Sequence, residues 1–395
     1  MLNGDLTING NMRNHAGLKV LHVFRPPKGG VFRHVCDLVA AQQAIGFHVG
    51  LLCDSQGADS EAERLLCELE PYCELGVHRV RFRRTPTLSD LFVSHYLNKR
   101  FANQQLDIIH GHGAKGGVVA RLVARSLGAR AIYTPHGGSM HFQSNTLSGA
   151  TFLGVEKLLR GRTDGIIFES GFVEQVYEQK VGRGCFETRV IRNGLRSEEF
   201  EPLETQTTGA DFVFLGELRQ LKGITVLVEA CTRLAERGND FSLNIVGSGP
   251  DEQRLKRLLS EHNLGQQVRL LGPIYPARNA LKQGQCLVLP SLAESMPYVV
   301  MESLAAGIPV IATDVGGLPE LFKGHEACLL PAGNAEALAL RMEQFLRDAR
   351  PFRQQMNVLR EGLRQRFQFD EMVGSVEKFY QQVLSVDRGA TLLSV

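Results

Sequence analysis

The sequence predicts an α/β protein of two domains, each with a parallel β-sheet covered by helices on both faces. The chain has 395 residues, the length of two domains of ordinary size. Short apolar runs alternate with amphipathic helical patterns along the sequence, and strands separated by helices form parallel βαβ units. A polar stretch near the middle of the chain separates two halves that repeat this pattern.

The first half supplies the elements of the first domain. Its predicted strands are short apolar runs: Val20–Phe24, His48–Cys53, Asp107–His110, Ala131–Thr134 and Gly165–Phe168. Helical patterns follow two of these runs, at Val31–Ile45 and Gly117–Leu127. The segment Val190–Leu195 is the expected last strand and turn of this domain.

The second half repeats the alternation. Its predicted strands are Asp211–Leu215, Ser242–Val246, Val268–Leu271, Cys286–Leu289 and Val310–Thr313, and its clearest helices are Gly223–Arg237 and Glu252–His262. The polar segment Glu201–Gly209 is rich in residues that end regular structure, so we expect the domain boundary near Asn193 to Gly209, with domains at 1–200 and 201–368. Ligands of such Rossmann-like sheets bind outside the carboxyl ends of the strands. Two such domains predict a central cleft faced by both sheets.

Composition excludes several classes of protein. The net charge of +2 gives no sign of nucleic-acid binding, and no run of 18 apolar residues could form a membrane-spanning helix. The eight cysteines contain no Cys-x-x-Cys pair, which argues against a zinc site or a disulfide framework and fits a reducing cytoplasm. The segment before residue 18 is polar and lacks a signal-peptide core. Localisation in the cytoplasm is therefore expected.

Two glutamates, Glu294 and Glu302, carry most of the functional information. They follow the strand at Cys286–Leu289, the first in a loop and the second inside a helix that is expected to stop at Gly307. The N–H groups at the start of that helix, near Met296 to Val299, would attract a phosphate. A carboxylate in the first turns of the helix suits the paired hydroxyls of a ribose. The segment therefore predicts a site for a nucleoside diphosphate.

This segment resembles the donor-binding signature of retaining glycosyltransferases with the GT-B fold, of the family-4 type (glycosyl transferases group 1). The signature is Glu, seven residues and Glu, followed by a helix of small residues and Gly-x-Pro-Val, which Gly307, Pro309 and Val310 complete. The resemblance extends from Val20 to about Leu384 and implies an acceptor-binding first domain and a nucleotide-sugar-binding second domain. It also implies that a helix at about 369–386 crosses back onto the first domain.

The loop after the first strand of the second domain carries two cations, Arg219 and Lys222. They would face the leaving diphosphate, whose negative charge grows as the glycosidic bond breaks. The family commonly has Arg directly after Gly216, where this chain has Glu217, so Arg219 stands two residues late whereas Lys222 keeps its place. The Gly-x-Gly-Pro turn at Gly249 resembles a family turn near the nucleotide base.

Further motifs follow strands of the first domain. The pair Gly29 and Gly30 resembles the family's glycine loop, which touches donor phosphates or acceptor, and Arg33 and His34 lie just after it. The family places a histidine near the transferred sugar, and His136 in Thr-Pro-His-Gly matches it.

The segment 107–117 contains both a histidine pattern and a Gly-x-Gly-x-x-Gly match. In the family a similar Asp-x-x-His-x-His segment occurs, so His112 is a candidate on the acceptor side, with loop packing as the alternative. The glycine pattern at 111–116 lies between a strand and a helix, but the acidic residue expected about 20 positions later is absent. We therefore reject a dinucleotide site.

The basic stretch 77–84 places Arg79, Arg81 and Arg83 at alternating positions, on one face of a strand. We favour an edge or solvent-facing strand. The alternative is a peripheral contact with an anionic membrane or a lipid-linked diphosphate acceptor, to which the segment Leu153–Arg162 would add.

The resemblance implies a metal-independent retaining transferase that uses no cofactor and moves a sugar from a UDP or GDP donor to a glycan or lipid-linked acceptor. Bacterial relatives of this kind build exopolysaccharide, capsule or lipopolysaccharide. The chain has no Asp-x-Asp pair to hold a metal at the diphosphate. The expected catalytic residues are His136, Arg219, Lys222 and Glu294. The expected donor-binding residues are Gly29, Gly30, Gly216, Gly249, Ser295, Met296, Pro297, Tyr298, Val299 and Glu302. Two alternatives remain: a nucleotide-sugar 2-epimerase on the same fold, and a catalytically silent nucleotide-sugar-binding protein.

Overall fold

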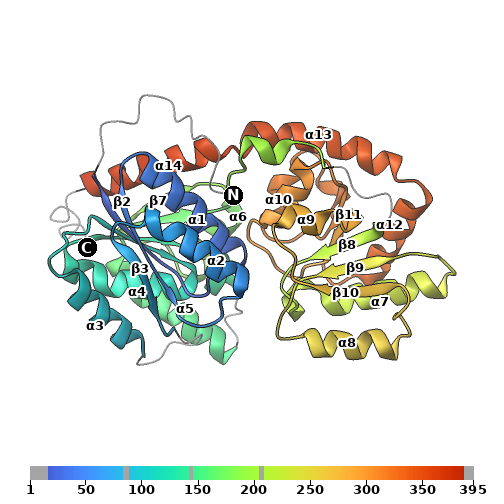
Figure 1. The fold of residues 1–395 in the computed structure, drawn as a ribbon, viewed down its shortest axis with the longest axis horizontal. Coiled ribbons are helices and arrows are strands. Elements are labelled where there is room, and N and C mark those ends of the chain that lie inside the picture. The colour runs from blue at the N-terminus through green and yellow to red at the C-terminus, as the bar shows by residue number, and fades with distance from the viewer. Residues whose placement is uncertain (1–16, 83–88, 142–145, 204–208, 387–395) are drawn as a thin grey trace. The chain divides into compact units, whose positions relative to one another are not determined.

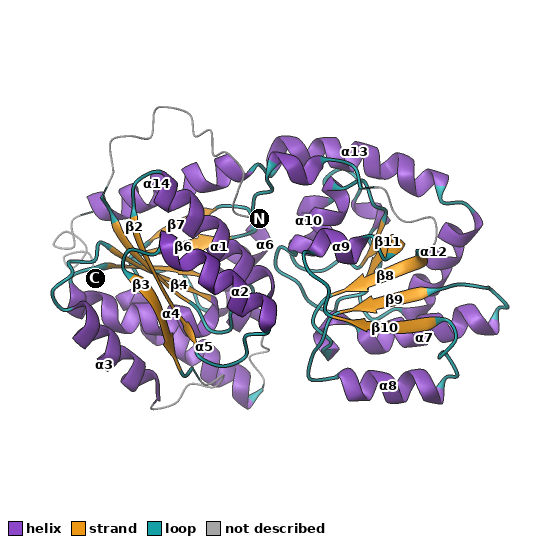
Figure 2. Ribbon diagram, in the orientation of Figure 1, coloured by secondary structure: helices purple, strands orange, loops and turns teal. Residues whose placement is uncertain are grey.

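The computed structural model describes residues 17–82, 89–141, 146–203 and 209–386, and Figures 1 and 2 show their helices and strands. The chain divides into two compact units, which we call domain 1 and domain 2. Domain 1 consists of the chain up to Arg192 together with the chain from Asp370 onward, and domain 2 is Asn193–Phe369. Domain 2 begins at Asn193, the first residue of the expected boundary region, and the first segment of domain 1 ends eight residues before residue 200, where its end was expected.

Domain 1, over its described residues, contains a parallel seven-stranded sheet in the order β3-β2-β1-β4-β5-β6-β7. Its strands are β1 (Lys19–Val23), β2 (His48–Asp54), β3 (Gly76–Val80), β4 (Ile108–His112), β5 (Arg130–Thr134), β6 (Gly165–Phe168) and β7 (Glu187–Val190). Its helices are α1 (Gly29–Ala44), α2 (Ser60–Leu69), α3 (Ser89–Phe101), α4 (Gly113–Val123), α5 (Leu147–Leu159), α6 (Gly171–Lys180) and α14 (Phe369–Ser385). Five of these strands coincide with predicted apolar runs to within two residues, whereas the strand expected at Val190–Leu195 ends at Val190.

The register of the central strands decides which polar side chains meet. In the parallel pair β1–β4, His22 lies opposite His110. Successive side chains of a strand point to opposite faces, so His110 and His112 share one face of β4. All three histidines are buried. The sequence pattern His-x-His therefore places polar side chains in the buried centre of the sheet.

The glycines of the rejected dinucleotide pattern serve close packing between β4 and α4. A Cβ on Gly111 would lie 2.4 Å from the carbonyl oxygen of Gly116, and one on Gly116 would lie 2.1 Å from that of Val23. Such distances exclude any side chain, because real Cβ atoms do not approach so closely. The pattern is explained by packing.

Domain 2 contains, over its described residues, a parallel five-stranded sheet in the order β10-β9-β8-β11-β12. Its strands are β8 (Ala210–Leu215), β9 (Leu243–Val246), β10 (Val268–Gly272), β11 (Gly284–Leu289) and β12 (Val310–Ala312). Its helices are α7 (Ile224–Glu236), α8 (Glu252–Glu261), α9 (Ala277–Leu281), α10 (Tyr298–Ala305), α11 (Leu318–Leu321), α12 (Ala335–Arg347) and α13 (Arg350–Arg366). One buried apolar cluster joins the sheet to α7, α10, α12 and α13.

Helix α14 completes domain 1 from the far end of the sequence, and Figure 1 shows it in red beside the blue and cyan elements of that domain. Its side chains Phe379, Tyr380 and Val383 are buried. A Cβ on Gly165 of β6 would lie 2.8 Å from Val383 and 2.9 Å from the Phe379 ring. The start of β6 therefore has to be glycine because α14 lies directly against it.

The basic stretch belongs to β3, an edge strand of domain 1, as we favoured. The strand ends at Val80, so Arg81 lies beyond it, and Arg83 lies outside the described residues. Arg79 is held by Glu63 on α2, with Nη1 2.6 Å from Oε2 and Nη2 2.9 Å from Oε1. The expected row of three arginines on one strand face is therefore wrong, because one is past the strand end and another is engaged by a carboxylate. Within the described part of the chain, no helix is both long and apolar enough to cross a membrane.

Candidate functional site

The strand-end loops of domain 2 are bonded to one another through their backbones. Leu292 N–H donates to Leu221 O at 2.8 Å, which joins the loop after β11 to the loop after β8. Gly317 N–H donates to Ser295 O at 2.7 Å, which adds the loop after β12. The loop after β9 joins through Leu218, whose N–H donates to Ser248 O at 3.0 Å. These four loops form a single structured surface at the carboxyl ends of the strands, where ligands of parallel sheets bind.

Glycines at three positions permit these close backbone contacts. Gly223 has a φ of +72°, and a Cβ there would lie 1.8 Å from Pro290 O. Gly316 has a φ of +64°, and a Cβ there would lie 1.9 Å from Glu294 O. The predicted donor-binding residue Gly249 similarly lies against Leu218, with its Cβ position 2.3 Å from Leu218 O. Any side chain at these three positions would push the loops apart.

Lys222 and Glu294, which are 72 residues apart in the sequence, meet on this surface. Lys222 Nζ donates to Glu294 Oε1 at 2.6 Å, and Ser291 Oγ donates to the same oxygen at 2.6 Å. The Glu294 side chain is 7% exposed and that of Lys222 is 22% exposed. A lysine that is fixed by a buried carboxylate but still open to solvent can receive an anionic ligand without first being ordered, which favours binding. The structure thus brings two of the predicted catalytic residues together.

Arg219 is placed differently from Lys222. Its Nη1 lies 3.4 Å from Oε2 of Glu217, and both side chains are about one-third exposed. Glu217 stands where the family commonly has arginine, and here its carboxylate partly offsets the charge of Arg219. Gly216, at the start of this loop, lies against Gly247, whose Cβ position is 2.0 Å from Gly216 O. The loop therefore offers Lys222 as its better-placed cation.

Helix α10 follows the Glu294 loop as predicted and carries Glu302. It begins at Tyr298 after Pro297, and the N–H groups of Val300 and Met301 bond to Pro297 O at 3.2 and 3.3 Å. The amide of Val299 lies in the first turn of the helix, where backbone N–H groups have no acceptor within the helix itself. The helix ends before Gly307, whose φ is +75°. Glu302 is the fifth residue of the helix and is 7% exposed.

Asn193 is a site residue that the sequence did not indicate. Its Nδ2 donates to Met296 O at 3.1 Å, so it fixes the turn that leads into α10. The side chain is 3% exposed, and its Oδ1 has no hydrogen-bond partner among the described residues. The same turn is held by the Gly317–Ser295 bond described above. The backbone before α10 is therefore fixed on two sides.

The glycine loop of domain 1 begins helix α1. The helix starts at Gly29, two residues earlier than the predicted Val31, and Gly29 has a φ of +67°. Gly29 and Gly30 are exposed, and a Cβ on Gly29 would meet nothing within 4 Å. Arg33 lies one turn into the helix, 3.6 Å from Asp37. The open glycines leave the start of α1 accessible to a ligand.

His136 follows β5 in an unusual backbone conformation. Its φ is +49° and that of Gly137 is +73°, two consecutive residues in the left-handed region. For a residue other than glycine this conformation costs about 1 kcal/mol or more and is concentrated at functional sites. His136 Nε2 lies 3.1 Å from His112 Nδ1, and the edge of His34 from α1 faces the His136 ring with centroids 5.0 Å apart. The structure therefore brings together the three predicted histidines His34, His112 and His136.

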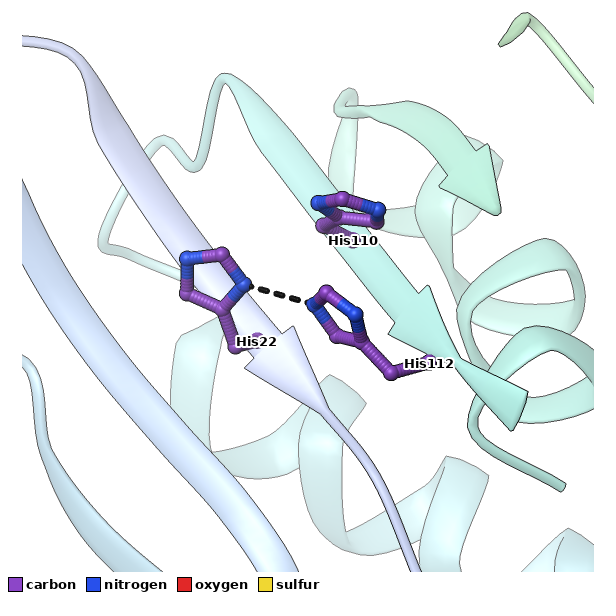
Figure 3. A group of neighbouring side chains, drawn as sticks. All are labelled: His22, His110 and His112. Atoms are coloured by element: carbon purple, nitrogen blue, oxygen red, sulfur yellow. Dashed lines mark hydrogen bonds between the residues drawn. The ribbon is translucent and has the colours of Figure 1, made fainter. Parts of the chain in front are cut away.

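Behind them lie two more buried histidines, and Figure 3 shows His22, His110 and His112 on neighbouring strands. His22 Nδ1 lies 2.9 Å from His112 Nε2. Burial lowers the pKa of His22 to about 4 and that of His136 to about 3, and it holds the pKa values of His110 and His112 well below 6.5. These four imidazoles are neutral near pH 7.

The histidine nitrogens lie close enough to suggest a metal site. Two groups of three, His22/His110/His112 and His34/His112/His136, each offer nitrogens within 4.8 Å of one another. In the first group, however, both nitrogens of every ring already have a hydrogen-bond partner. A metal would have to displace those bonds and bring charge into a region without a neighbouring carboxylate ligand, since the described groups of this kind contain histidines alone. The geometry favours a hydrogen-bonded cluster.

Comparisons with known proteins match both domains. The family model described as Glycosyltransferase Family 4 matches residues 28–199, and the model described as Glycosyl transferases group 1 matches residues 196–360. The chain is 33% identical over 178 residues to WcaL of Escherichia coli, a glycosyltransferase assigned to colanic acid biosynthesis. That match covers 42% of this chain and 44% of WcaL, so it spans less than half of the relative's length.

Solved structures share the fold over nearly the whole chain. Sucrose-phosphate synthase from Thermosynechococcus elongatus superposes with a TM-score of 0.79 at 23% identity, covering 94% of this chain and all of that one. Anabaena Alr3699/HepE in complex with UDP-glucose superposes with a TM-score of 0.75 at 19% identity, covering 92% and 100%. The two parallel sheets, the two adjoining family matches and these structural neighbours agree: the chain belongs to the group 1 glycosyltransferases and has the GT-B fold, with two Rossmann-like domains.

Proposed function

We propose that this protein is a metal-independent retaining glycosyltransferase that moves a sugar from a nucleotide-sugar donor to a glycan or lipid-linked acceptor in the synthesis of a polysaccharide. The observation that carries the proposal is the pair formed by Lys222 and Glu294 beside the start of α10. The crystallised complex of HepE with UDP-glucose, on the same fold, and the assignment of WcaL to colanic acid biosynthesis support it.

In domain 2, each residue has a definite task in this reaction. The start of α10 and Lys222 neutralise the diphosphate, whose charge increases as it leaves. Glu302 accepts hydrogen bonds from the two ribose hydroxyls. Glu294, which is fixed by Lys222 and Ser291, retains a second carboxylate oxygen for hydroxyls of the transferred sugar. Because the acceptor hydroxyl attacks the sugar on the face from which the diphosphate leaves, the departing phosphate oxygen takes the proton of that hydroxyl.

In domain 1, His136 offers a neutral imidazole to a sugar hydroxyl. Its pKa, lowered to about 3 by burial, excludes the imidazolium near neutral pH. A neutral ring has one donor and one acceptor nitrogen, and the donor or acceptor role of the free nitrogen depends on the tautomer. Gly29, Gly30, Arg33 and His34 supply the remaining contacts to phosphates or acceptor.

The proposal is tested by thermal unfolding of the purified protein with a panel of UDP- and GDP-sugars, with NAD and ATP as controls. A ligand present at 100 times its dissociation constant should stabilise the protein by about 2.7 kcal/mol. We expect stabilisation by sugars of one nucleotide and no effect of NAD. The proposed donor site would be contradicted if NAD alone raised the melting temperature. It would also be contradicted if none of the nucleotide sugars raised it.

Chelation should leave turnover unchanged. The ammonium of Lys222 and the partial positive charge of the N–H groups at the start of α10 would neutralise the diphosphate, so the proposed mechanism requires no bound metal. Transfer rates measured with and without excess EDTA should agree within about twofold, a difference of about 0.4 kcal/mol. Loss of activity that added Mg²⁺ or Mn²⁺ restores would disprove the metal-independent mechanism.

A catalytically silent nucleotide-sugar-binding protein is a second candidate, and the contact between Arg219 and Glu217 favours it. That contact reduces the positive charge available to a leaving diphosphate. The two functions differ in one measurable respect. A silent protein would be stabilised by the nucleotide sugar but would release no nucleoside diphosphate with any acceptor tested.

A further inference from the structure

A continuous chain of hydrogen bonds runs from His136 through the centre of domain 1. We call this set of side chains the histidine chain; its members in order are His136, His112, His22, Gln42, Tyr380, His110 and Thr134. Its links come from β5, β4, β1, α1 and α14. All members except the half-buried His136 are buried. It thus connects a half-buried ring at a strand end to two remote helices.

The first half of the histidine chain fixes the position of each proton. Gln42 Oε1 lies 2.8 Å from His22 Nε2, and an amide oxygen can only accept, so the proton of His22 is on Nε2. A neutral imidazole carries one proton, so His22 Nδ1 accepts from His112 Nε2 at 2.9 Å. His112 Nδ1 must in turn accept from His136 Nε2 at 3.1 Å. His136 is therefore protonated on Nε2, and its Nδ1 carries a lone pair.

The second half runs in the same direction. Gln42 Nε2 donates to the Tyr380 hydroxyl at 3.4 Å, and that hydroxyl donates to His110 Nδ1 at 2.7 Å. His110 Nε2 then donates to Thr134 Oγ1 at 2.8 Å. Every hydrogen bond of the histidine chain therefore joins one donor to one acceptor. Burial lowers the pKa values of His22, His110 and His112, so these rings are neutral and each keeps one donor and one acceptor nitrogen.

The direction depends on one side chain. An amide turned by 180° would present Nε2 to His22 and would reverse every bond from Gln42 to His136. His136 would then carry its proton on Nδ1 and could only donate from that nitrogen. Tyr380 fixes the place of the Gln42 amide, since its hydroxyl lies 3.4 Å from Gln42 Nε2 and 2.7 Å from His110 Nδ1.

We infer that Gln42 and Tyr380 are positioning residues that hold His136 as the Nε2–H tautomer, so that its Nδ1 accepts a hydrogen bond from a substrate hydroxyl. The second clause rests on the proposed function, because it needs a sugar at His136, whereas the first concerns the protein alone. A site that presents a lone pair selects a hydroxyl and rejects a group that can only accept, such as fluorine in its place.

The experiment is NMR of the full chain with ¹⁵N-labelled histidine, in the absence of any substrate. The ring nitrogens report directly whether each carries a proton, and His136→Asn assigns the His136 signals. We expect a protonated Nε2 and an unprotonated Nδ1 at pH 7. A proton on Nδ1, or equal populations of both tautomers, would overturn the inference, and this wild-type measurement requires no variant to fold.

Two variants test the roles of the positioning residues. Gln42→Met removes the group that gives the chain its direction, so we expect His136 to become a mixture of tautomers. Tyr380→Phe removes the partner of the Gln42 amide, so we expect it also to make His136 a mixture of tautomers. The matched control is Tyr177→Phe, since Tyr177 is also buried in domain 1 but its hydroxyl has no partner among the described residues. Unchanged His136 signals in Gln42→Met would refute the role of Gln42.

Activity separates this inference from the proposed function. With donor and acceptor, Tyr380→Phe should lower kcat/KM by about 3- to 10-fold, the effect of one hydrogen bond, while Tyr177→Phe should not. If the wild-type protein shows the Nε2–H tautomer but no transfer, the proposed function fails and the positioning role stands. If transfer occurs with His136 in the other tautomer, the positioning role fails and the proposed function stands.

Discussion

Replacing Lys222 by alanine is expected to lower kcat by about 10²- to 10³-fold while weakening donor binding much less, as for other groups that stabilise charge in the transition state. Lys222 Nζ is held by Glu294 at 2.6 Å and is still partly open to solvent. Its attraction for the diphosphate grows as the bond to the sugar breaks, because negative charge then accumulates on the leaving oxygen. Steady-state kinetics give kcat, and calorimetric titration with the donor gives the affinity.

The chain offers a matched control for Lys222. Lys256 and Glu252 on α8 also form an ion pair with Nζ and Oε1 2.6 Å apart, but both side chains are well exposed. Lys256→Ala should leave kcat unchanged, since exposed pairs contribute little to stability. Circular dichroism of both variants must show an intact fold, because Lys222→Ala removes a partner from the buried Glu294 carboxylate. If Lys222→Ala reduced affinity and catalytic efficiency equally, with an unchanged rate at saturation, Lys222 would serve ground-state binding.

Glu302→Ala should weaken nucleotide-sugar binding by about 10- to 100-fold, since a hydrogen bond to a charged group contributes about 1.5–3 kcal/mol. Glu302 is on the second turn of α10 and is almost completely buried. It lies on the helix whose first amides would bind the diphosphate, so the proposed site would place the ribose next to those phosphates beside its carboxylate. The dissociation constants of the nucleoside diphosphate and of the nucleotide sugar should rise together.

The control for Glu302 is a buried glutamate elsewhere in domain 2. Glu343 on α12 is 9% exposed and lies 2.5 Å from Arg347 and 3.6 Å from Arg237. Glu343→Ala should lower the melting temperature without changing the affinity for the nucleotide. An unchanged dissociation constant in Glu302→Ala would remove the ribose assignment, and equal losses in both variants would indicate a general effect on the fold of the domain.

The fold was predictable because most of the strands are short apolar runs between turns, and β6 has the predicted bounds, Gly165–Phe168. The boundary was expected near Asn193 to Gly209, and domain 2 begins at Asn193. The sequence did not show that the residues directly after Asn193 already pack into domain 2. Leu195 forms backbone bonds with Phe367 and Phe369, and Phe200 lies in the domain 2 core. Such contacts join residues more than 150 positions apart, so local composition could not show them.

The candidate site shows the same limit. Lys222 and Glu294 were found from a motif, and the structure brings them together. The positioning residues Gln42 and Tyr380 have no motif, because they are 338 residues apart and are ordinary members of two amphipathic helices. The pairing of His22 with His110 depends on the register of β1 on β4. The repeat His-x-His in one strand was the available indication that polar groups gather inside this sheet.

The discontinuity of domain 1 has a consequence for the order in which the protein acquires its structure during synthesis. Domain 2, from Asn193 to Phe369, is synthesised before the body of α14. Domain 2 can therefore close on itself first, while domain 1 waits with an apolar surface where Phe379 and Val383 belong and with Gln42 and His110 lacking the Tyr380 hydroxyl. Domain 1 is the first domain to be synthesised and the last to be complete. A fragment ending at Arg192 would lack α14 and would expose that apolar surface, which favours aggregation.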